Sequence, residues 1–231
     1  MQVKVTNLTK QYKNGKGVHS VSFTVKPGIN GLLGANGAGK TTLMRMMAGI
    51  LQPDRGHVFM DEFSVFTETY RSMLGYLPQN FGFYPEFTAR KFMMYLASLK
   101  GLEKRKAQKK TEELLELVGL SEQIDQKIHT FSRGMAQRLG IAQVLINDPK
   151  ILILDEPTSG LDPMERARFR EWIARLGKDR IVLFSTHIVS DLEQIANRVL
   201  ILKDGTLLYD GDWDANRQDL EQFYIEEVDQ G

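Results

Sequence analysis

The chain has 231 residues, 42% of them hydrophobic, which is enough to bury a core as one mid-sized domain. Its 30 Lys and Arg balance 29 Asp and Glu to a formal charge of +1, which argues against nucleic acid as a partner. Cysteine is absent, which excludes a disulfide framework and thiolate metal sites and is compatible with a reducing compartment.

The apolar pattern predicts neither a leader nor a membrane span. The N-terminal residues, MQVKVTNLTKQYKNG, contain no apolar segment typical of a secretory signal. The longest apolar runs, such as Phe92 to Ala97, extend over about six residues, whereas a membrane-spanning helix needs roughly 20. The chain is therefore not expected to cross a bilayer by itself.

The first part of the chain predicts strands, then a glycine-rich loop and a helix. Residues 2 to 6 and Val18 to Val25 alternate apolar and polar positions, so we expect two antiparallel strands with one solvated face each. Ile29 to Leu33 is a short apolar run that predicts a third strand. Thr41 to Ile50 has helical spacing, and a glycine-rich loop joins the two.

The middle of the chain predicts a helical insert. Strand signals are missing from Thr88 to about Asn147, and helical spacing is found in Thr88 to Lys100, Glu103 to Val118 and Met135 to Ile146. The basic cluster Lys104 to Lys110 is interpreted as a solvated helix face rather than a binding patch.

The last third predicts a return to alternating strands and helices. Lys150 to Asp155 and Arg180 to Ser185 are apolar enough for strands buried on both faces, and Pro163 to Leu176 predicts the helix between them. Asp204-Gly205 lies between two apolar runs and predicts a hairpin with a type I′ turn. A polar helix is expected from about Asp212. The pattern as a whole indicates an α/β fold.

The segment GANGAGKT, Gly34 to Thr41, matches the P-loop pattern, in which glycines allow backbone N–H groups to surround phosphate oxygens. We expect Lys40 to reach the β- and γ-phosphates and Thr41 to bind Mg²⁺. The alternative, a chance glycine-rich turn, is disfavoured by the strand before it and the helix after it. The predicted nucleotide-contacting residues are Gly34, Ala35, Asn36, Gly37, Ala38, Gly39, Lys40, Thr41 and Thr42.

Two adjacent carboxylates end the apolar strand ILILDE. They are expected beyond the carboxyl end of the strand, where ligands bind in open α/β sheets. Asp155 then suits the Mg²⁺ shell and Glu156 suits a general base for the attacking water. Such a pair is alternatively a helix N-cap, but the P-loop favours the functional reading. His187 follows another strand, so we expect it to bond the γ-phosphate or the water.

With the P-loop, LILDEP and Ser185-Thr186-His187 in this order, the sequence resembles the nucleotide-binding domain of ABC transporters over essentially its whole length. The resemblance implies a P-loop NTPase (RecA-like) core with a mainly parallel sheet, an N-terminal antiparallel β-subdomain and a helical subdomain at about residues 80–148. Residues 1–231 would form one ABC ATPase domain. It also implies ATP and Mg²⁺ as cofactors, with ATP hydrolysis coupled to transport.

The resemblance assigns three further positions. Tyr12 matches the aromatic residue that stacks on adenine, and Gln79, in Tyr76-Leu77-Pro78-Gln79, matches the glutamine that senses Mg²⁺ and the membrane partner. Gln79 is therefore a candidate for both catalysis and metal binding. Ser159 to Asp162 resembles the family's D-loop at the dimer interface, which makes Asp162 a candidate nucleotide-site residue.

The family's signature, usually L-S-G-G-Q, corresponds here to Phe131-Ser132-Arg133-Gly134-Met135. The Ser132 hydroxyl and the Gly134 N–H can donate to a γ-phosphate at a helix N-terminus. Arg133 and Met135 depart from the pattern. A similar S-R-G-M form occurs in the branch whose ATPase is encoded apart from its membrane subunit and works as an exporter.

The resemblance also implies the partners. Two such domains bind head to tail, so a single set of motifs implies a dimer, of like or unlike chains, with a transmembrane permease at the cytoplasmic face of the membrane. The aromatic segment Phe81 to Phe87 is interpreted as a seat for the permease or as ordinary packing. Two alternatives to this transport subunit are a soluble ABC-type ATPase that remodels a macromolecular complex and a low-turnover regulatory subunit.

Overall fold

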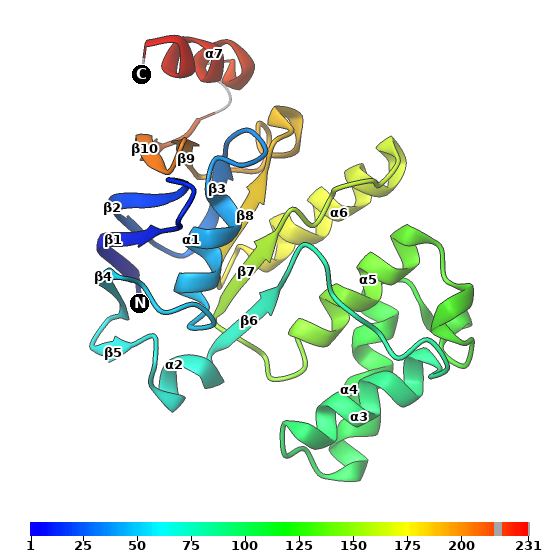
Figure 1. Cartoon of the computed structure of the whole chain (residues 1–231). Coiled ribbons are helices and arrows are strands. Elements are labelled where there is room, and N and C mark those ends of the chain that lie inside the picture. The colour runs from blue at the N-terminus through cyan, green and yellow to red at the C-terminus, as the bar shows by residue number, and fades with distance from the viewer. Residues whose placement is uncertain (215–218, 231) are drawn as a thin grey trace.

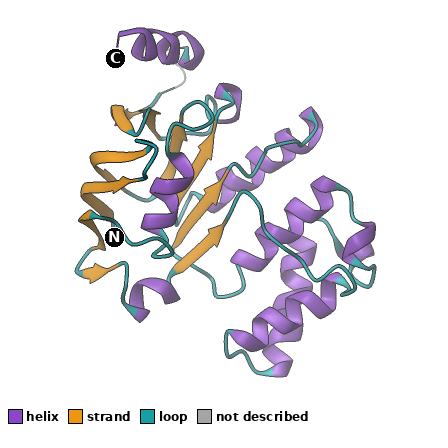
Figure 2. Cartoon of the chain, in the orientation of Figure 1, coloured by secondary structure: helices purple, strands orange, loops and turns teal. Residues whose placement is uncertain are grey.

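The structure, a computed structural model, describes residues 1–214 and 219–230. Two β-sheets lie side by side, and helices lie between and around them (Figure 2). The α/β class predicted from the sequence is confirmed.

The first sheet is antiparallel, as expected for the N-terminal strands. Its strands, in spatial order, are β2 (Gly17–Val25), β1 (Val3–Gln11), β4 (Arg55–Met60) and β5 (Phe63–Ser64). In β1, Val3 and Val5 are buried while Lys4 is exposed, which is the alternation that predicted the strand. β4 and β5 were not predicted.

The second sheet holds the site. Its strands, in spatial order, are β10 (Thr206–Asp212), β9 (Arg198–Lys203), β3 (Gly28–Leu33), β8 (Ile181–Thr186), β7 (Ile151–Asp155) and β6 (Leu74–Leu77). All neighbours are parallel except β10, which is antiparallel to β9. Every residue of β7 and β8 is buried, which confirms the prediction of strands covered on both faces.

Helices cover both faces of this second sheet (Figure 1). The helices are α1 (Lys40–Met47), α2 (Glu68–Ser72), α3 (Ala89–Leu99), α4 (Lys104–Leu117), α5 (Arg133–Val144), α6 (Pro163–Leu176) and α7 (Leu220–Gln230). Short 3₁₀ turns are η1 (Ser121–Gln123), η2 (Ile128–Thr130) and η3 (Val189–Asp191). Helix α1 packs between the sheets, where its buried Leu43 and Met44 join Ile151 and Ile153 of β7 in one core cluster.

The opposite face of the second sheet packs on the remaining helices. Leu152 and Leu154 of β7 join Phe169 and Ile173 of α6 in a second core cluster, because alternate strand residues point to opposite faces. Helices α3, α4 and α5 lie between β6 and β7 in sequence and form a separate group in Figure 1. These three helices agree with the predicted helical segments, and α4 carries the basic cluster on an exposed face.

The C-terminal region agrees with the sequence in its hairpin and differs in its helix. Asp204 and Gly205 have φ values of 45° and 80° between β9 and β10, as a type I′ turn requires. A helix from Asp212 is wrong, because β10 extends to that residue and Arg198 contacts Asp210 at 2.7 Å and Asp212 at 2.8 Å. The described helix begins at Leu220, and residues 215–218 of the predicted helix lie outside the described residues.

Candidate nucleotide-binding site

The loop from Gly34 to Gly39 joins the end of β3 to the first residue of α1. Gly39 has a φ of 104°, and a Cβ there would lie 2.7 Å from the carbonyl oxygen of Gly17. As the N-cap of α1, Gly39 provides no side-chain hydrogen bond to the first turn. The helix N-terminus therefore keeps N–H groups available for an anion.

A cavity of about 410 Å³ lies against this loop. Its lining includes the exposed aromatic ring of Tyr12, which follows β1, and Gln79, which follows β6. The lining residues are Tyr12, Asn14, Lys16, Gly17, Asn36, Gly37, Gly39, Lys40, Thr41, Thr42, Gln79 and Glu156. The structure thus brings most of the predicted nucleotide, metal and catalytic residues to one cavity, although they span 145 positions, from 12 to 156.

A larger hollow of about 950 Å³ lies on β1, β2 and β4. It is lined mainly by uncharged polar groups and contains none of the predicted site residues. The chemistry of the loop and the carboxylates, not the size of the hollow, identifies the smaller cavity as the site.

Lys40 and Glu156 are paired at the floor of the cavity. The Lys40 ammonium donates to the carbonyl oxygens of Gly34, at 2.6 Å, and Ala35, at 3.1 Å. It also lies 3.0 Å from Glu156 Oε1, with side chains that are only 5% and 4% exposed. This last contact is an ion pair and not a well-directed hydrogen bond. Each buried charge is therefore balanced by the other.

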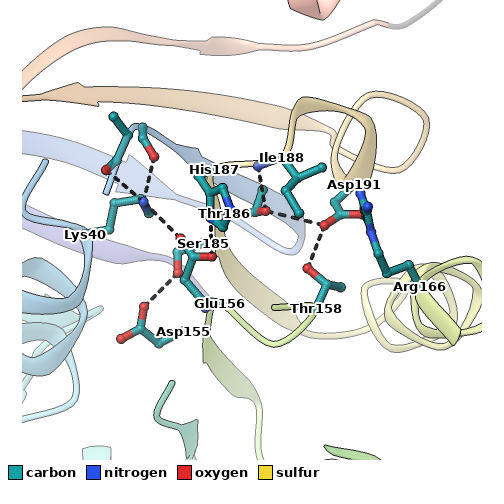
Figure 3. A network of polar contacts seen from close by, with 12 residues as sticks. Lys40, Asp155, Glu156, Thr158, Arg166, Ser185, Thr186, His187, Ile188 and Asp191 are labelled. Carbon is teal, nitrogen blue, oxygen red and sulfur yellow. Dashed lines mark hydrogen bonds and ion pairs between the residues drawn. The ribbon is translucent and has the colours of Figure 1, made fainter. Parts of the chain in front are cut away.

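Glu156 also contacts His187, which follows β8 (Figure 3). Glu156 Oε2 lies 2.7 Å from His187 Nδ1, so one carboxylate joins the lysine to the histidine. The backbone of Glu156 has a φ of 49°, which is uncommon for a residue with a side chain. The Ser185 hydroxyl accepts from the Glu156 N–H at 2.9 Å and holds this backbone in place. Strained backbone of this kind is concentrated at functional sites.

Asp155, at the end of β7, is fully buried. Its Oδ1 accepts from the Ser185 hydroxyl at 2.8 Å, whereas its Oδ2 has no hydrogen-bond partner among the described residues. Burial raises the pKa of the Asp155 carboxyl above its ordinary value, against the opposing effect of the Ser185 and Thr41 hydroxyls. A buried oxygen without a partner, beside a threonine hydroxyl, fits the hard oxygen ligands that Mg²⁺ takes.

Within residues 1–214 and 219–230 there is no cluster of three His, Asp or Glu side chains able to hold a metal by themselves. In nucleotide sites Mg²⁺ is usually bound through one or two protein oxygens together with the phosphates of the nucleotide. Thr41, Asp155 and Gln79 are the predicted candidates for those oxygens.

Comparison with known proteins decides the family. The sequence profile of the ABC transporter family matches residues 18–159, more than half of the chain. The chain belongs to the ABC transporter family. It is an ATP-binding subunit of this family and an ATPase, and the sequence-based assignments of family, P-loop NTPase fold and ATPase activity are confirmed.

Similar ABC proteins cover nearly the whole chain. The ABC transporter ATP-binding protein YxlF of Bacillus subtilis is 42% identical over 95% of this chain and 72% of its own length. The bacitracin transport ATP-binding protein BcrA of Bacillus licheniformis is 40% identical over 89% of this chain and 68% of its own length. A solved ATP-binding subunit of an ABC transporter has a TM-score of 0.86 at 27% identity, covering 99% of this chain and 100% of its own.

The residues that resemble the ABC signature lie apart from the cavity of their own chain. Ser132 is the N-cap of α5, where its hydroxyl accepts from the Met135 N–H at 3.2 Å. Gly134 follows in the first turn. Asp162 is the N-cap of α6 and accepts from the Glu165 N–H at 2.9 Å. None of these three predicted residues lines the cavity.

The starts of α5 and α6 lie against each other. A Cβ at Gly134 would lie 3.1 Å from the Glu165 side chain, and one at Gly160 would overlap the Arg133 guanidinium. Arg133, a departure from the usual ABC signature, thus packs on the loop that resembles the D-loop. Because Gly160 has no side chain, the Arg133 guanidinium can occupy the space beside it.

Sequence reasoning missed several residues of the site. Three residues that line the cavity come from the turn after β1 and the first residue of β2, where no motif marked them. They are Asn14, Lys16 and Gly17. Ser185 was noted only as part of the Ser-Thr-His stretch, yet it bonds both Asp155 and the Glu156 backbone. The sequence did offer a signal for Ser185, because it lies at the end of the predicted strand that neighbours the strand ending in the two carboxylates.

Proposed function

We propose that this subunit hydrolyses Mg²⁺-bound ATP in the cavity at the P-loop and uses the cycle to move a separate transmembrane permease in the export direction. The observation that carries the proposal is the continuous contact from Lys40 through Glu156, which both line the cavity, to His187 beside it. This contact brings together a cation that can bind phosphate, a carboxylate that can accept a proton from water and a second polar group.

Binding of the nucleotide is assigned to three groups of residues. The exposed Tyr12 ring provides a surface on which adenine can stack. The N–H groups of the loop and the α1 N-terminus surround the phosphates, and Lys40 binds them as a point charge. Thr41, Asp155 and Gln79 would hold Mg²⁺, which neutralises charge on the β- and γ-phosphates.

Hydrolysis is assigned to Glu156 and His187. Glu156 accepts the proton of the attacking water, and its burial beside Lys40 keeps bulk water from competing. The 2.7 Å contact from His187 orients the carboxylate, and the imidazole follows β8 at the carboxyl edge of the sheet, from where it would reach the γ-phosphate. Gln79 lies across the same cavity, where it can sense the nucleotide.

We further propose that a second ATP-binding domain completes the site. Ser132, Gly134 and Asp162 are positioned at the starts of α5 and α6 and do not line their own chain's cavity. The head-to-tail arrangement implied by the family would place these groups on the partner's nucleotide. ATP would then stabilise the closed pair, and hydrolysis would release it.

The aromatic segment after Gln79 is the proposed permease contact. Tyr84 is 49% exposed and Tyr95 is 39% exposed, and their rings pack edge to face with centroids 5.6 Å apart. The ammonium of Lys91 lies 4.3 Å from the centroid of Phe87. Exposed aromatic rings beside a cation suit a protein interface better than solvent.

The membrane is reached through that partner. No helix within the described part of the chain is long and apolar enough to span a bilayer. The permease would therefore hold the subunit at the cytoplasmic face. The export direction is supported by the S-R-G-M form of the signature, at Ser132 to Met135.

The proposal is tested by phosphate release and membrane binding together. We expect Tyr84→Asp to keep Mg²⁺-dependent ATP turnover but to lose binding to membranes that contain the permease. Ile225→Asp, at an equally exposed apolar position on α7, is the matched control and should retain both. Turnover without Mg²⁺ would contradict the proposed chemistry, and unchanged membrane binding by Tyr84→Asp would contradict the proposed contact.

A further inference from the structure

A fully buried carboxylate, that of Asp191, contacts the chain just after β7, the end of β8 and helix α6. It ends η3, four residues after His187, and Figure 3 shows its contacts with both neighbouring loops and with α6. Asp191 does not line the nucleotide cavity. Its role must therefore be sought in what it holds.

One oxygen of Asp191 contacts the two loops that carry Glu156 and His187. Asp191 Oδ2 accepts from the Thr158 hydroxyl at 2.6 Å and lies 3.4 Å from the Thr186 hydroxyl. Thr158 is two residues after Glu156, and Thr186 directly precedes His187. The Thr186 oxygen in turn accepts from the Ile188 N–H at 3.0 Å, so the backbone on both sides of His187 is held.

The other oxygen of Asp191 contacts α6. Asp191 Oδ1 accepts from Arg166 Nε at 3.0 Å and Nη2 at 2.8 Å, and Arg170 Nη1 lies 3.5 Å away. Two guanidinium groups thus balance the buried negative charge. The carboxylate is thereby fixed in one orientation, with Oδ2 directed at the threonines.

We infer that Thr158 and Asp191 are positioning residues for ATP hydrolysis, which set the Glu156 carboxylate against His187. The inference rests on the roles proposed above for Glu156 and His187. Glu156 has a left-handed backbone conformation, which persists only where the surroundings hold it. The Thr158 anchor lies on the C-terminal side of this strained residue, and the Ser185 hydroxyl holds its N–H. Both anchors act on the backbone and neither touches the cavity.

If this cluster positions Glu156, disturbing it should lower the rate of ATP hydrolysis without weakening ATP binding. A cluster that only stabilises the fold would not affect these two quantities differently. Loss of the Thr158 anchor keeps the P-loop, Lys40 and Tyr12, and a less firmly held Glu156 carboxylate competes less for the Lys40 ammonium, so ATP should bind at least as tightly as before. The Glu156 carboxylate, however, would no longer be held at its 2.7 Å contact, and small misplacements of a catalytic group lower the rate strongly.

The test uses the full chain and compares Thr158→Val with Thr158→Ser. Valine keeps the shape and removes the hydroxyl, whereas serine keeps the hydroxyl. We expect Thr158→Val to lower kcat roughly 10- to 100-fold without raising KM for ATP, and Thr158→Ser to restore most of kcat. Thr111→Val, at a threonine that is also buried but lies on α4, is the matched control and should leave kcat unchanged.

Two results would overturn the inference. A kcat for Thr158→Val equal to that of Thr111→Val overturns it, as does a serine variant as slow as the valine variant. If valine at position 158 prevents folding, Thr158→Ala removes the hydroxyl without added bulk and is judged by the same split between kcat and KM. Glu156→Gln, measured in parallel, tests the proposed base separately, since full turnover in that variant would reject the role of Glu156 as the base, whereas the two results above reject only the positioning role.

Discussion

Lys40 and Glu156 form an ion pair with 3.0 Å between Nζ and Oε1, and both side chains are almost completely buried. The two groups belong to different proposed steps, because Lys40 binds phosphate and Glu156 activates water. In this geometry the ammonium donates to two carbonyl oxygens and is ion-paired with the carboxylate, so an arriving phosphate would compete with these contacts. Binding and hydrolysis are therefore linked through one contact.

Replacing Glu156 with Gln should nearly abolish turnover while ATP binding remains. Glutamine keeps the size of the side chain but cannot accept the proton of water, a role that contributes ~10²- to 10⁴-fold. Because the Lys40 ammonium loses a competing anion, ATP should bind at least as tightly as before. Phosphate release and titration calorimetry measure the two quantities, and unchanged turnover would reject Glu156 as the base.

Replacing Lys40 with Ala should weaken ATP binding roughly 10- to 150-fold, the range expected when one charge-assisted hydrogen bond is lost. The comparison is Lys26→Ala, an exposed lysine that lies before β3 and does not line the cavity. Equilibrium dialysis with Mg²⁺-ATP gives both dissociation constants. Equal constants for the two variants would be incompatible with a phosphate role for Lys40.

Replacing Tyr12 with Ala should weaken ATP binding roughly 5- to 150-fold, because stacking of a base on an aromatic ring contributes about 1–3 kcal/mol. Inorganic tripolyphosphate has no base, so its binding should be unchanged. Tyr12→Phe retains the ring and should bind ATP as the natural chain does. A similar loss for ATP and tripolyphosphate would show that Tyr12 acts on the phosphates or on the loop and not on adenine.

Ionisation of Tyr76, on β6, should lower the free energy of unfolding at alkaline pH. Burial raises the pKa of its hydroxyl to about 12, whereas the unfolded chain has a value of about 10. The unfolded state therefore ionises first, and stability falls as the pH rises from 10 towards 12. Since Tyr76 is only about half buried, we expect a loss of about 1 kcal/mol.

The control for this pH dependence is Tyr76→Phe, which cannot ionise at that position. Urea unfolding between pH 9 and 11 should show a smaller decline in the free energy of unfolding for this variant than for the natural chain. Parallel declines in the two proteins would mean that Tyr76 does not contribute to the alkaline loss.

The fold was predictable where local signals coincide. The α6 helix has the predicted bounds because Asp162 caps its first turn, Pro163 suits its first position and Gly177 follows its end. Strands β7 and β8 were predictable because their apolar runs are too short for helices and too continuous for half-exposed strands.

Other elements depend on contacts that the sequence does not display. β4 was missed because its buried side is short, with Val58 and Met60, and its partner β1 lies some 50 residues earlier. The predicted helix was placed from about Asp212 because the residues after the hairpin are polar, but β10 pairs with β9 as far as Asp212, where Arg198 contacts the strand.

The site likewise contains residues that local sequence signals predict and contacts that they do not. The motifs and the family resemblance predicted most of the residues that line the cavity, because the P-loop and the strand ends have recognisable spacing. The contacts of Asp191 with Thr158 and Arg166 join positions 33 and 25 residues apart, and no spacing rule predicts them. Motifs thus indicate the groups expected to bind the nucleotide, while the groups proposed to position them are identified only from the three-dimensional arrangement.

The central proposal is that a second ATP-binding domain completes the nucleotide site, and the mass of the ATP-loaded Glu156→Gln chain tests it most directly. Light scattering with Mg²⁺-ATP should give twice the chain mass of 26.3 kDa, since Ser132 and Gly134 of each copy would bind the other copy's nucleotide. Without ATP, and for Lys40→Ala with ATP, the mass should remain that of one chain. A Glu156→Gln chain that binds ATP and stays at 26.3 kDa would contradict the proposal.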